Sequence, residues 1–299
     1  MKIIITGSLG NISKPLAQEL IQKGHDVTVI SSNPSKQDEI KNLGATAAIG
    51  SLEDPDFLAT TFKGADAVYT MIPPGNYFDP NFDLLAYYVR LGKNYAEAVK
   101  ISGVKKLVNL STIGAQMKEG NGILAGAHHV ELILNELPMD VAITHMRPNS
   151  FYYNLFGFIE MIKSQGIIAA NYGGEHIIPF VSPIDIAAAV AKELIIPFKG
   201  RKTQSVASED ISGNETARIL GEAIGKPGLT WVIVSDEETL NGLISIGMNP
   251  KIAAGLVEMY SALQSGLLAE DYYRNPPTEM GKVKMKDFAK EFAATYNND

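Results

Sequence analysis

Short apolar runs alternate with amphipathic helical patterns through the first half of this 299-residue sequence. The apolar runs are rich in β-branched residues, as strands usually are, and they predict six strands at residues 2–6, 27–30, 45–49, 67–72, 106–110 and 140–146. Between them, apolar positions recur at helical spacing and predict helices at residues 15–23, 35–43, 80–102 and 125–135, with another beginning at Asp54-Pro55. Strands that alternate with helices of this length indicate βαβ units and a parallel sheet.

The second half of the chain has a less regular pattern. It predicts helices at residues 151–164, 183–194, 214–224, 236–246, 250–263 and 285–296. It also predicts short strands at residues 177–181, 203–207 and 230–234. We therefore expect residues 151–299 to form a smaller mixed α/β region that covers the substrate. This region is expected to pack directly on the larger sheet domain of residues 1–150.

Six parallel strands joined by right-handed crossovers make a doubly wound α/β sheet. In such sheets, ligands bind outside the carboxyl ends of the strands, near the point where the strand order reverses. Residues that follow the predicted strands are therefore expected around one crevice, and they include Gly7, Ser31, Pro73, Ser111 and Pro148.

A glycine-rich turn joins the first predicted strand to the first predicted helix. It reads TGSLGNIS from Thr6 to Ser13, a Gly-x-x-Gly-x-x-Ser pattern. Gly7 permits a tight turn, and Gly10 lets the backbone approach a pyrophosphate with no Cβ in the way. The N–H groups at the start of the following helix can then hold the anion. A strand before the turn and an amphipathic helix after it are the required context, so we predict a nicotinamide dinucleotide site on a Rossmann-type sheet. The alternative is a purely structural turn.

The end of the second strand bears on the choice of cofactor. Sites that prefer NAD place an acidic residue there to bind the ribose 2′-hydroxyl. This sequence has Ser31, Ser32 and Asn33 instead, with Lys36 one turn later, and no carboxylate lies between residues 27 and 37. Hydroxyls, an amide and a lysine suit a 2′-phosphate, so the pattern favours NADP(H) over NAD(H). The alternative for Lys36 is a solvated helical residue.

Composition excludes some kinds of site and bears on the expected partners and location of the protein. The absence of cysteine excludes disulfides, thiolate zinc sites and cysteine nucleophiles. The net charge of −7 is spread along the chain, so no nucleic-acid partner is expected. The first apolar run is too short for a signal peptide, and no stretch approaches the roughly 20 apolar residues that span a bilayer. We therefore expect a cytoplasmic protein that does not bind membranes.

Six segments in order resemble motifs of one family. The glycine turn has Ser13 where the family's last glycine usually stands, and the second segment has Ser51 where an acid is usual. The six segments are Thr6–Ser13, Ile49–Pro55, Lys63–Tyr69, Val104–Thr112, Thr144–Phe151 and Ser182–Ala187. Together they resemble the NmrA-like family of atypical short-chain dehydrogenase/reductase proteins, clearly over residues 1–190 and loosely beyond.

The resemblance implies which residues lie along the cofactor. Ser51 and Leu52 are implied near the adenine, and Asn149 and Phe151 beside the nicotinamide ring. The two prolines of the segment after strand four are expected to form a rigid apolar lip against the cofactor. The full expected cofactor set is Gly7, Ser8, Gly10, Asn11, Ile12, Ser31, Ser32, Asn33, Lys36, Ser51, Leu52, Ile72, Pro73, Pro74, Ser111, Thr112, Pro148, Asn149 and Phe151.

The proton relay of related dehydrogenases is missing. Those enzymes use a Tyr-x-x-x-Lys pair, in which tyrosine is the general acid and lysine lowers its pKa. None of the 12 tyrosines here has a lysine four residues later. The helix that carries the pair in relatives reads AGAHHVE from Ala125 to Glu131. Since consecutive helical residues point about 100° apart, His128 and His129 do not face one ion, and no metal site is predicted.

Three interpretations remain open. The first is a reductase whose acceptor needs little acid catalysis, such as a quinone, which some family members reduce. The second is a non-catalytic NADP(H)-binding regulator, which the family also contains. The third is a reductase with a substitute acid, for which His128, Tyr152 and Tyr153 are candidates. Ser111 is a further catalytic candidate, and an epimerase-like enzyme acting on sugar nucleotides is a remaining alternative. Tyr152, Tyr153 and Phe156 are expected either to line the substrate site or to pack in the core.

Overall fold

The computed structural model describes residues 1–298, and its largest element is a parallel sheet of seven strands. The strand order is β10-β6-β5-β4-β1-β2-β3, which reverses beside β1. The strands are β1 (Lys2–Ile5), β2 (Asp26–Ser31), β3 (Thr46–Ile49), β4 (Ala67–Thr70), β5 (Lys106–Leu110), β6 (Ala142–Pro148) and β10 (Arg201–Val206). The predicted doubly wound Rossmann-type sheet is confirmed.

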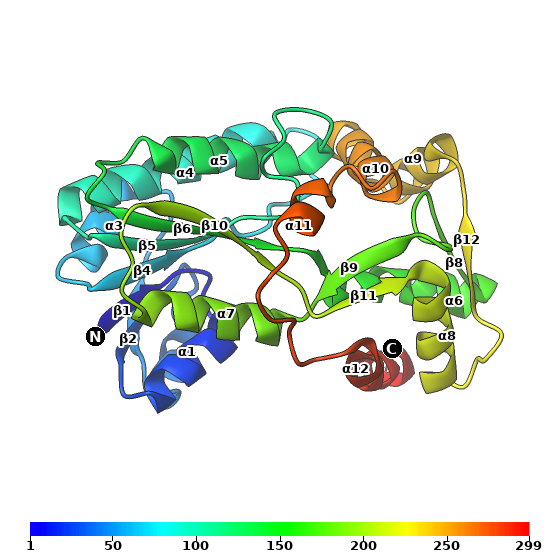
Figure 1. The fold of residues 1–299 in the computed structure, drawn as a ribbon, viewed down its shortest axis with the longest axis horizontal. Coiled ribbons are helices and arrows are strands. Elements are labelled where there is room, and N and C mark those ends of the chain that lie inside the picture. Colours follow the sequence, from blue (N-terminus) through cyan, green and yellow to red (C-terminus); the bar gives the residue numbers. More distant parts are fainter. Residues whose placement is uncertain (299) are drawn as a thin grey trace.

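Helices cover both faces of this sheet (Figure 1). The helices of the sheet layer are α1 (Ser13–Gln22), the short η1 (Pro34–Lys36) and α2 (Gln37–Asn42), α3 (Pro55–Phe62), α4 (Leu84–Ser102), η2 (Gly122–Leu124), α5 (Ala125–Asn135) and α7 (Pro183–Ile195). Strand alternation divides the core between the faces, since Ile3 and Ile5 pack toward α1 and α7 while Ile4 packs toward α3, α4 and α5. The sheet is therefore buried on both sides, as its continuous apolar strands require.

The seventh strand comes from the second half of the chain. The sequence predicts a strand at residues 203–207 but places it in the smaller region, whereas β10 pairs in parallel with β6, with Arg201 opposite Ile143. Helix α7 returns the chain to the face of the sheet covered by α1, so the next strand reaches the free edge of β6. The sheet therefore uses residues on both sides of position 150, and the division into two domains there stays a prediction.

The smaller region is mixed α/β, as predicted. Its two sheets combine β7 (Ser150–Phe151), β9 (Ile177–Val181) and β11 (Glu209–Ser212) in one, and β8 (Ile167–Ala170) and β12 (Thr230–Ile233) in the other. Its helices are η3 (Tyr152–Phe158), α6 (Ile159–Gln165), α8 (Gly213–Ala223), α9 (Asp236–Ser245), α10 (Pro250–Gln264), α11 (Glu270–Arg274) and α12 (Met285–Asn298). An aromatic core joins them, with Tyr152, Trp231 and Phe288 all buried.

The Asp-Ile-Ala segment holds the two regions together. Asp185, in the first turn of α7, is buried and accepts hydrogen bonds from the Ser208 hydroxyl at 2.6 Å and from the backbone N–H groups of Lys282 and Val283 at 2.9 and 3.0 Å. A Cβ on Gly281 would lie 2.3 Å from this carboxylate. Asp185 therefore fixes the extended segment that leads into α12.

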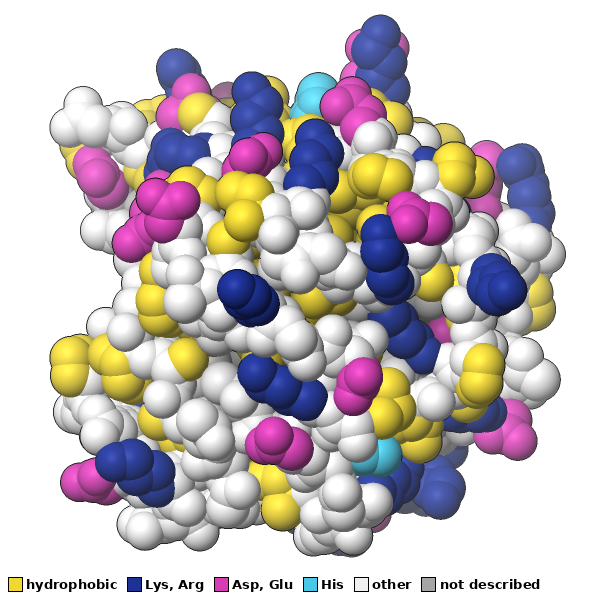
Figure 2. All heavy atoms as spheres, turned by 90° about the vertical axis from the view of Figure 1, so that its left-hand side faces the viewer, with side chains coloured by type: hydrophobic (Ala, Val, Ile, Leu, Met, Phe, Trp, Pro, Cys, Tyr) yellow, Lys and Arg dark blue, Asp and Glu magenta, His cyan; other side chains and the backbone are white. Residues whose placement is uncertain are grey.

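The surface at the amino ends of the strands carries both signs of charge. Figure 2 shows Lys and Arg side chains beside Asp and Glu side chains across this face. Several of these are paired, as in the 2.6 Å contact between Lys105 and Asp140. Within residues 1–298, none of the helices combines the length and the apolar character that crossing a bilayer needs.

A chain of polar side chains crosses the middle of the large sheet. Thr70 donates to the Asn109 amide oxygen at 3.1 Å, and the Asn109 amide nitrogen lies 3.2 Å from His145 Nδ1. His145 Nε2 lies 3.2 Å from the Asn135 amide oxygen. An amide nitrogen donates and an amide oxygen accepts, so these partners select the neutral imidazole with its proton on Nε2. Burial lowers the pKa of His145 from 6.5 to about 4.

We expect His145 to make the fold sensitive to mild acid. Below pH 6.5 the unfolded chain binds a proton at this residue, whereas the folded chain does so only near pH 4. The free energy of unfolding should therefore fall as the pH drops through this window, by up to about 3 kcal/mol from this residue. Urea denaturation of the wild type and of His145→Asn between pH 4 and pH 7 measures the effect. Equal pH slopes for the two proteins would show that His145 does not cause it.

Candidate functional site

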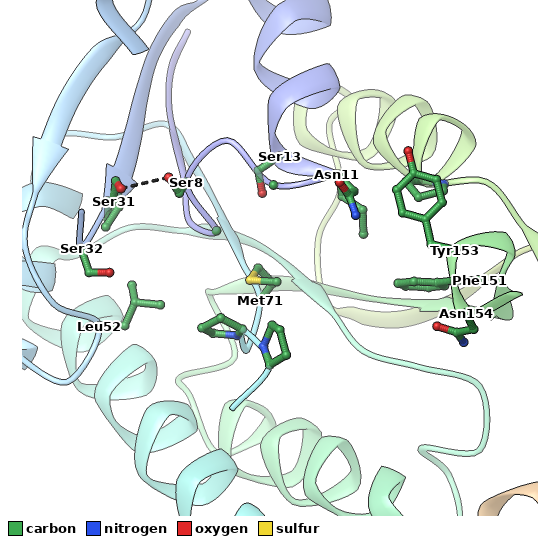
Figure 3. A pocket seen from close by; sticks show the side chains of 17 residues that line it. Ser8, Asn11, Ser13, Ser31, Ser32, Leu52, Met71, Phe151, Tyr153 and Asn154 are labelled. Atoms are coloured by element: carbon green, nitrogen blue, oxygen red, sulfur yellow. Dashed lines mark hydrogen bonds between the residues drawn. The ribbon is translucent and has the colours of Figure 1, made fainter. Parts of the chain in front are cut away.

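A cleft of about 480 Å³ lies at the carboxyl ends of the strands, beside the point where the strand order reverses. Its volume is in the range of small-molecule and cofactor sites. Figure 3 shows it running from Ser31, Ser32 and Leu52 at one end to Phe151, Tyr153 and Asn154 at the other. The structure brings these predicted cofactor residues to the lining: Gly7, Ser8, Gly10, Asn11, Ile12, Ser31, Ser32, Leu52, Pro73, Pro74 and Phe151.

The glycine turn forms one wall of the cleft, and its conformation depends on small residues. Gly7 has φ +89°, and a Cβ there would lie 2.6 Å from Ser13 Oγ. The next residue, Ser8, also has positive φ, +54°, a conformation that non-glycine residues seldom adopt. Gly10 donates to the Gly7 carbonyl at 3.1 Å and presents its backbone to the cleft. The turn is therefore tightly folded with backbone exposed to a ligand.

The start of α1 offers unpaired hydrogen-bond donors. The helix has no side-chain N-cap and no acidic residue in its first turn. Within the described part of the chain, the backbone N–H groups of Asn11, Ile12 and Ser13 have no hydrogen-bond acceptor. These groups and the positive end of the helix dipole make a site for an anion such as a pyrophosphate.

Ser13 replaces the usual last glycine without opening the turn. Its hydroxyl is buried and donates to the Thr6 carbonyl at 2.8 Å. The Thr6 hydroxyl in turn accepts from the N–H of Met71, just after β4, at 3.0 Å. These bonds fix the turn between β1 and β4.

The Ser31 end of the cleft carries hydroxyls and no charge. Ser31 and Ser8 share a hydrogen bond at 2.9 Å between their hydroxyls. No lining residue of the cleft is acidic or basic in the part of the chain that the structure describes. The sequence has no carboxylate at the end of β2, where NAD-preferring sites have one. The described lining of the cleft contains no carboxylate either.

Three predicted residues at this end lie outside the cleft lining. Asn33 caps η1 by accepting from Ser35 N–H at 3.0 Å, and Ser51 accepts from Glu53 N–H at 3.1 Å. Lys36 pairs with Glu39 at 2.8 Å, and that pair is partly exposed. Their role toward a cofactor stays a prediction, and for Lys36 it requires the ammonium group to leave Glu39.

Four further predicted residues at the sheet edge also lie outside the lining. Ile72 packs against the core between the sheet and the helices α3, α4 and α5. Asn149 is 3% exposed and donates to the Val206 carbonyl at 3.1 Å, which turns its amide toward β10. Thr112 follows β5 by two residues, and Pro148 is the last residue of β6.

Tyr152 cannot act as an acid in the cleft, contrary to the prediction. Its ring is fully buried and stacks between Phe180 and Phe288, with centroids 5.6 and 5.2 Å away. Its hydroxyl donates to the Val283 carbonyl at 3.3 Å. Burial and the nearby Glu209 carboxylate raise its pKa well above the usual value for tyrosine. Of the two expected roles, the structure shows core packing.

His128 and Ser111 are also absent from the cleft lining. His128 Nδ1 donates to the Ala115 carbonyl at 2.8 Å, which turns the ring toward the loop before α5. The Ser111 hydroxyl donates to Glu131 at 2.5 Å in a buried cluster. Glu131 also accepts two bonds from Arg147, at 2.6 and 2.9 Å. Ser111 therefore belongs to an ion-pair cluster that joins β5, β6 and α5.

The cleft contains residues that the sequence did not assign to it. Asn154 and Pro183 line it, as does Tyr153, which the sequence proposed only as a substitute acid. Asn154 follows Phe151 by three residues, and residues so spaced share a face in a 3₁₀-helix such as η3. The same spacing also places two residues on one face of an α-helix, so the predicted helix at residues 151–164 could already have pointed to Asn154. Pro183 lines the cleft because it is the first residue of α7.

Comparison with known proteins gives the family. The family model of the NmrA-like family matches residues 1–272. The chain belongs to the NmrA-like family. This confirms the resemblance inferred from the six motifs.

Solved structures and a curated relative match nearly the whole chain. The Citrobacter sp. triphenylmethane reductase complexed with NADP(H) has a TM-score of 0.77 at 20% identity, covering 98% of this chain and 100% of that one. The Escherichia coli NADPH-dependent quinone oxidoreductase QOR2, complexed with NADPH, has a TM-score of 0.80 at 18% identity, covering 97% and 99%. An uncharacterized Schizosaccharomyces pombe protein is 22% identical over 305 residues, covering 91% of this chain and 100% of that protein. At these identities the solved structures show a common fold.

Proposed function

We propose that this NmrA-like protein binds NADP(H) in the cleft and transfers hydride to a small, neutral, electron-poor acceptor of the quinone class. The observation that carries the proposal is the glycine turn. It presents three unpaired N–H groups to an uncharged cleft at the switch point of a Rossmann sheet. Both solved relatives described above were crystallised with NADP(H) or NADPH, which supports the cofactor.

The residues present fit a nicotinamide dinucleotide. The N–H groups of Asn11, Ile12 and Ser13 would hold the pyrophosphate. Ser31 and Ser32 would face the adenosine ribose, where the absence of a carboxylate favours the 2′-phosphate. The bound cofactor would supply hydride. The residues toward Phe151 would receive the nicotinamide and the acceptor.

The chemistry of the lining favours acceptors that need no protein acid. Tyr153 is the titratable side chain that lines the cleft, and burial and the neighbouring Glu291 carboxylate raise its pKa to about 12. A quinone can be reduced without an acid in the site, because hydride addition gives a resonance-stabilised hydroquinone anion that takes its proton from water. An unactivated ketone would give a strongly basic alkoxide, and its reduction needs an acid in the site.

Two alternatives use the same cleft. A regulator that binds NADP(H) without turnover is supported by the absence of a general acid from the lining. An epimerase acting on sugar nucleotides has less support, since the diphosphate of such a substrate is usually held by cationic side chains. The cleft presents none among the residues that the structure describes.

Absorbance of NADPH with a panel of quinones and unactivated ketones tests the proposal. We expect NADPH oxidation with quinones and none with the ketones, because the cleft lacks an acid. NADPH binding is titrated by fluorescence in parallel. Binding without oxidation by any quinone would eliminate the reductase and leave the regulator.

A further inference from the structure

We propose that two copies of this chain associate through the outer face of α10 and form a symmetric dimer that leaves both cofactor clefts open. The surface concerned is a second groove, of about 770 Å³, between α10, the start of α4 and the start of α5. Helix α10 lies along the upper edge of the molecule in Figure 1. In the described part of the chain, the groove and the cofactor cleft share no lining residue, so the inference goes beyond the proposed function.

The groove has apolar walls and is bordered by exposed apolar side chains. Phe78, Leu85 and Ile246 are 53%, 44% and 62% exposed. Leu85 lines the groove, Phe78 lies in the loop that enters it before α4, and Ile246 lies in the turn that enters it before α10. A cluster of exposed apolar side chains of this kind commonly marks a protein interface. Apolar residues that line the groove include Leu84, Leu85, Ile123, Ala125, Ile252 and Ala254.

The walls of the groove are fixed to one another. Asn249 is 3% exposed, its backbone N–H donates to the Tyr77 carbonyl at 2.9 Å, and its amide donates to the Asp79 carbonyl at 2.9 Å. These bonds hold the loop before α4 against the start of α10. On the other wall, a Cβ on Gly122 would overlap the Gly255 carbonyl oxygen, so η2 lies directly on α10. A preformed surface loses little conformational freedom when a partner binds.

The outer face of α10 carries two opposite charges. Lys251, Ala254, Gly255 and Glu258 all line the groove, and their spacing places them along one side of the helix. Lys251, Ala254 and Glu258 are exposed. Neither Lys251 nor Glu258 forms an ion pair within residues 1–298. Both charges are therefore available to a partner.

These charges are complementary to themselves about a two-fold axis. The midpoint between Lys251 and Glu258 falls between Ala254 and Gly255. If two α10 helices pack antiparallel with the axis at that point, Lys251 of each copy faces Glu258 of the other, and two ion pairs form. The small residues at the crossing point let the helices approach closely. Such an arrangement is an isologous interface, in which the same surface is used by both copies.

The charge pattern favours a second copy over a different partner. The remaining charged side chain of the groove, Asp83, accepts from the Ala86 N–H at 2.9 Å and caps α4. A uniformly acidic or basic partner would therefore attract one of the two charges on α10 and repel the other. A second copy of this chain neutralises both and covers the apolar side chains between them, which gives an apolar centre with a charged rim.

Sedimentation velocity of the full chain across the micromolar range tests the proposal. The wild type should show a monomer–dimer equilibrium that depends on concentration. Lys251→Glu and Glu258→Lys should each raise the dimer dissociation constant at least about tenfold, because like charges then meet twice in each dimer. Lys251→Glu/Glu258→Lys should restore it to within about threefold of wild type, since both ion pairs form again with their signs exchanged. The matched control is Lys100→Glu, because Lys100 is exposed at the other end of α4.

An equimolar mixture of Lys251→Glu and Glu258→Lys adds a second test. The mixed dimer has opposite charges at both contacts, so the two variants should associate with each other more tightly than either does with itself. A monomeric wild type would overturn the inference. So would a dimer that Lys251→Glu does not weaken, or a loss that the double variant does not restore.

NADPH titration of the same variants separates this inference from the proposed function. Because the groove lies apart from the cleft, every variant should bind NADPH with the wild-type dissociation constant, and thermal unfolding checks the fold. Loss of NADPH binding in Lys251→Glu with an intact fold would contradict a dimer that leaves the clefts open. A wild type that dimerises as expected but binds no NADPH would refute the proposed function and leave the dimer in place.

Discussion

Gly10→Val should lower the affinity for NADPH at least about 100-fold, a loss of about 2.7 kcal/mol in binding free energy, and leave the sheet folded. Gly10 presents its backbone to the cleft where the pyrophosphate would lie, so a branched side chain fills that space. The cost to folding is small by comparison. A Cβ at this position would lie 3.1 Å from the Gly7 carbonyl oxygen, which a shift of a few tenths of an ångström relieves.

Fluorescence titration with NADPH measures this loss, and thermal unfolding checks the fold. Gly228→Val is the matched control, because Gly228 is exposed and a Cβ there has no atom within 4 Å. The control should bind NADPH as the wild type does. Gly10→Val with wild-type affinity would mean that the turn does not approach the cofactor.

Arg147→Leu should lower the free energy of unfolding by about 3–5 kcal/mol. The side chains of Arg147 and Glu131 are 10% and 7% exposed, and Arg147 also contacts Asp271 at 2.9 Å. Without Arg147, the Glu131 carboxylate stays buried next to an apolar side chain. Arg147→Leu/Glu131→Leu should recover much of the loss, since a buried pair can be replaced by apolar groups at low cost.

The pH dependence of Arg147→Leu gives a second test of the ion pair. Burial opposes ionisation of Glu131, but Arg147 outweighs it and lowers the Glu131 pKa. The ion pair therefore stabilises the folded wild type fully above the pKa of an unfolded glutamate, about 4.3. This stabilisation is lost as the pH falls through the pKa of Glu131 in the folded protein. In Arg147→Leu the unpaired carboxyl takes up a proton more readily, so the deficit should shrink in acid. Urea denaturation at several pH values measures it, and a deficit below about 1 kcal/mol at neutral pH would contradict the buried ion pair.

Local patterns predicted most of the large sheet. Strand β5 and helix α5 begin and end where the periodicity places them. Asp54 caps α3 through the N–H groups of Asp56 and Phe57, with Pro55 in the first turn as expected. The position of β10 was not predictable in this way, because its partner β6 is set by the return of α7 to the sheet. The short strands β7, β8 and β11 were missed. β7 has only two residues, and β8 and β11 lie in the second half of the chain, where the pattern is less regular.

In the candidate site, too, some features could be predicted from the sequence and others could not. The glycine turn was predictable because Gly7, Gly10 and the start of α1 are adjacent in sequence. Side-chain direction was not. Tyr152 and Tyr153 are neighbours in a 3₁₀-helix, where successive residues point about 120° apart, so one is buried and the other lines the cleft. Lys36 seemed free for a phosphate until the structure placed Glu39 against it.

The most direct test of the account is a titration of the wild-type protein with NADPH and with NADH, followed by nicotinamide fluorescence. The account predicts saturable binding of one equivalent of NADPH per chain, with a lower dissociation constant than for NADH. Tighter binding of NADH would contradict the assignment of the Ser31 end to a 2′-phosphate. No saturable binding of either nucleotide would contradict the central claim that the glycine turn of this cleft holds a nicotinamide dinucleotide.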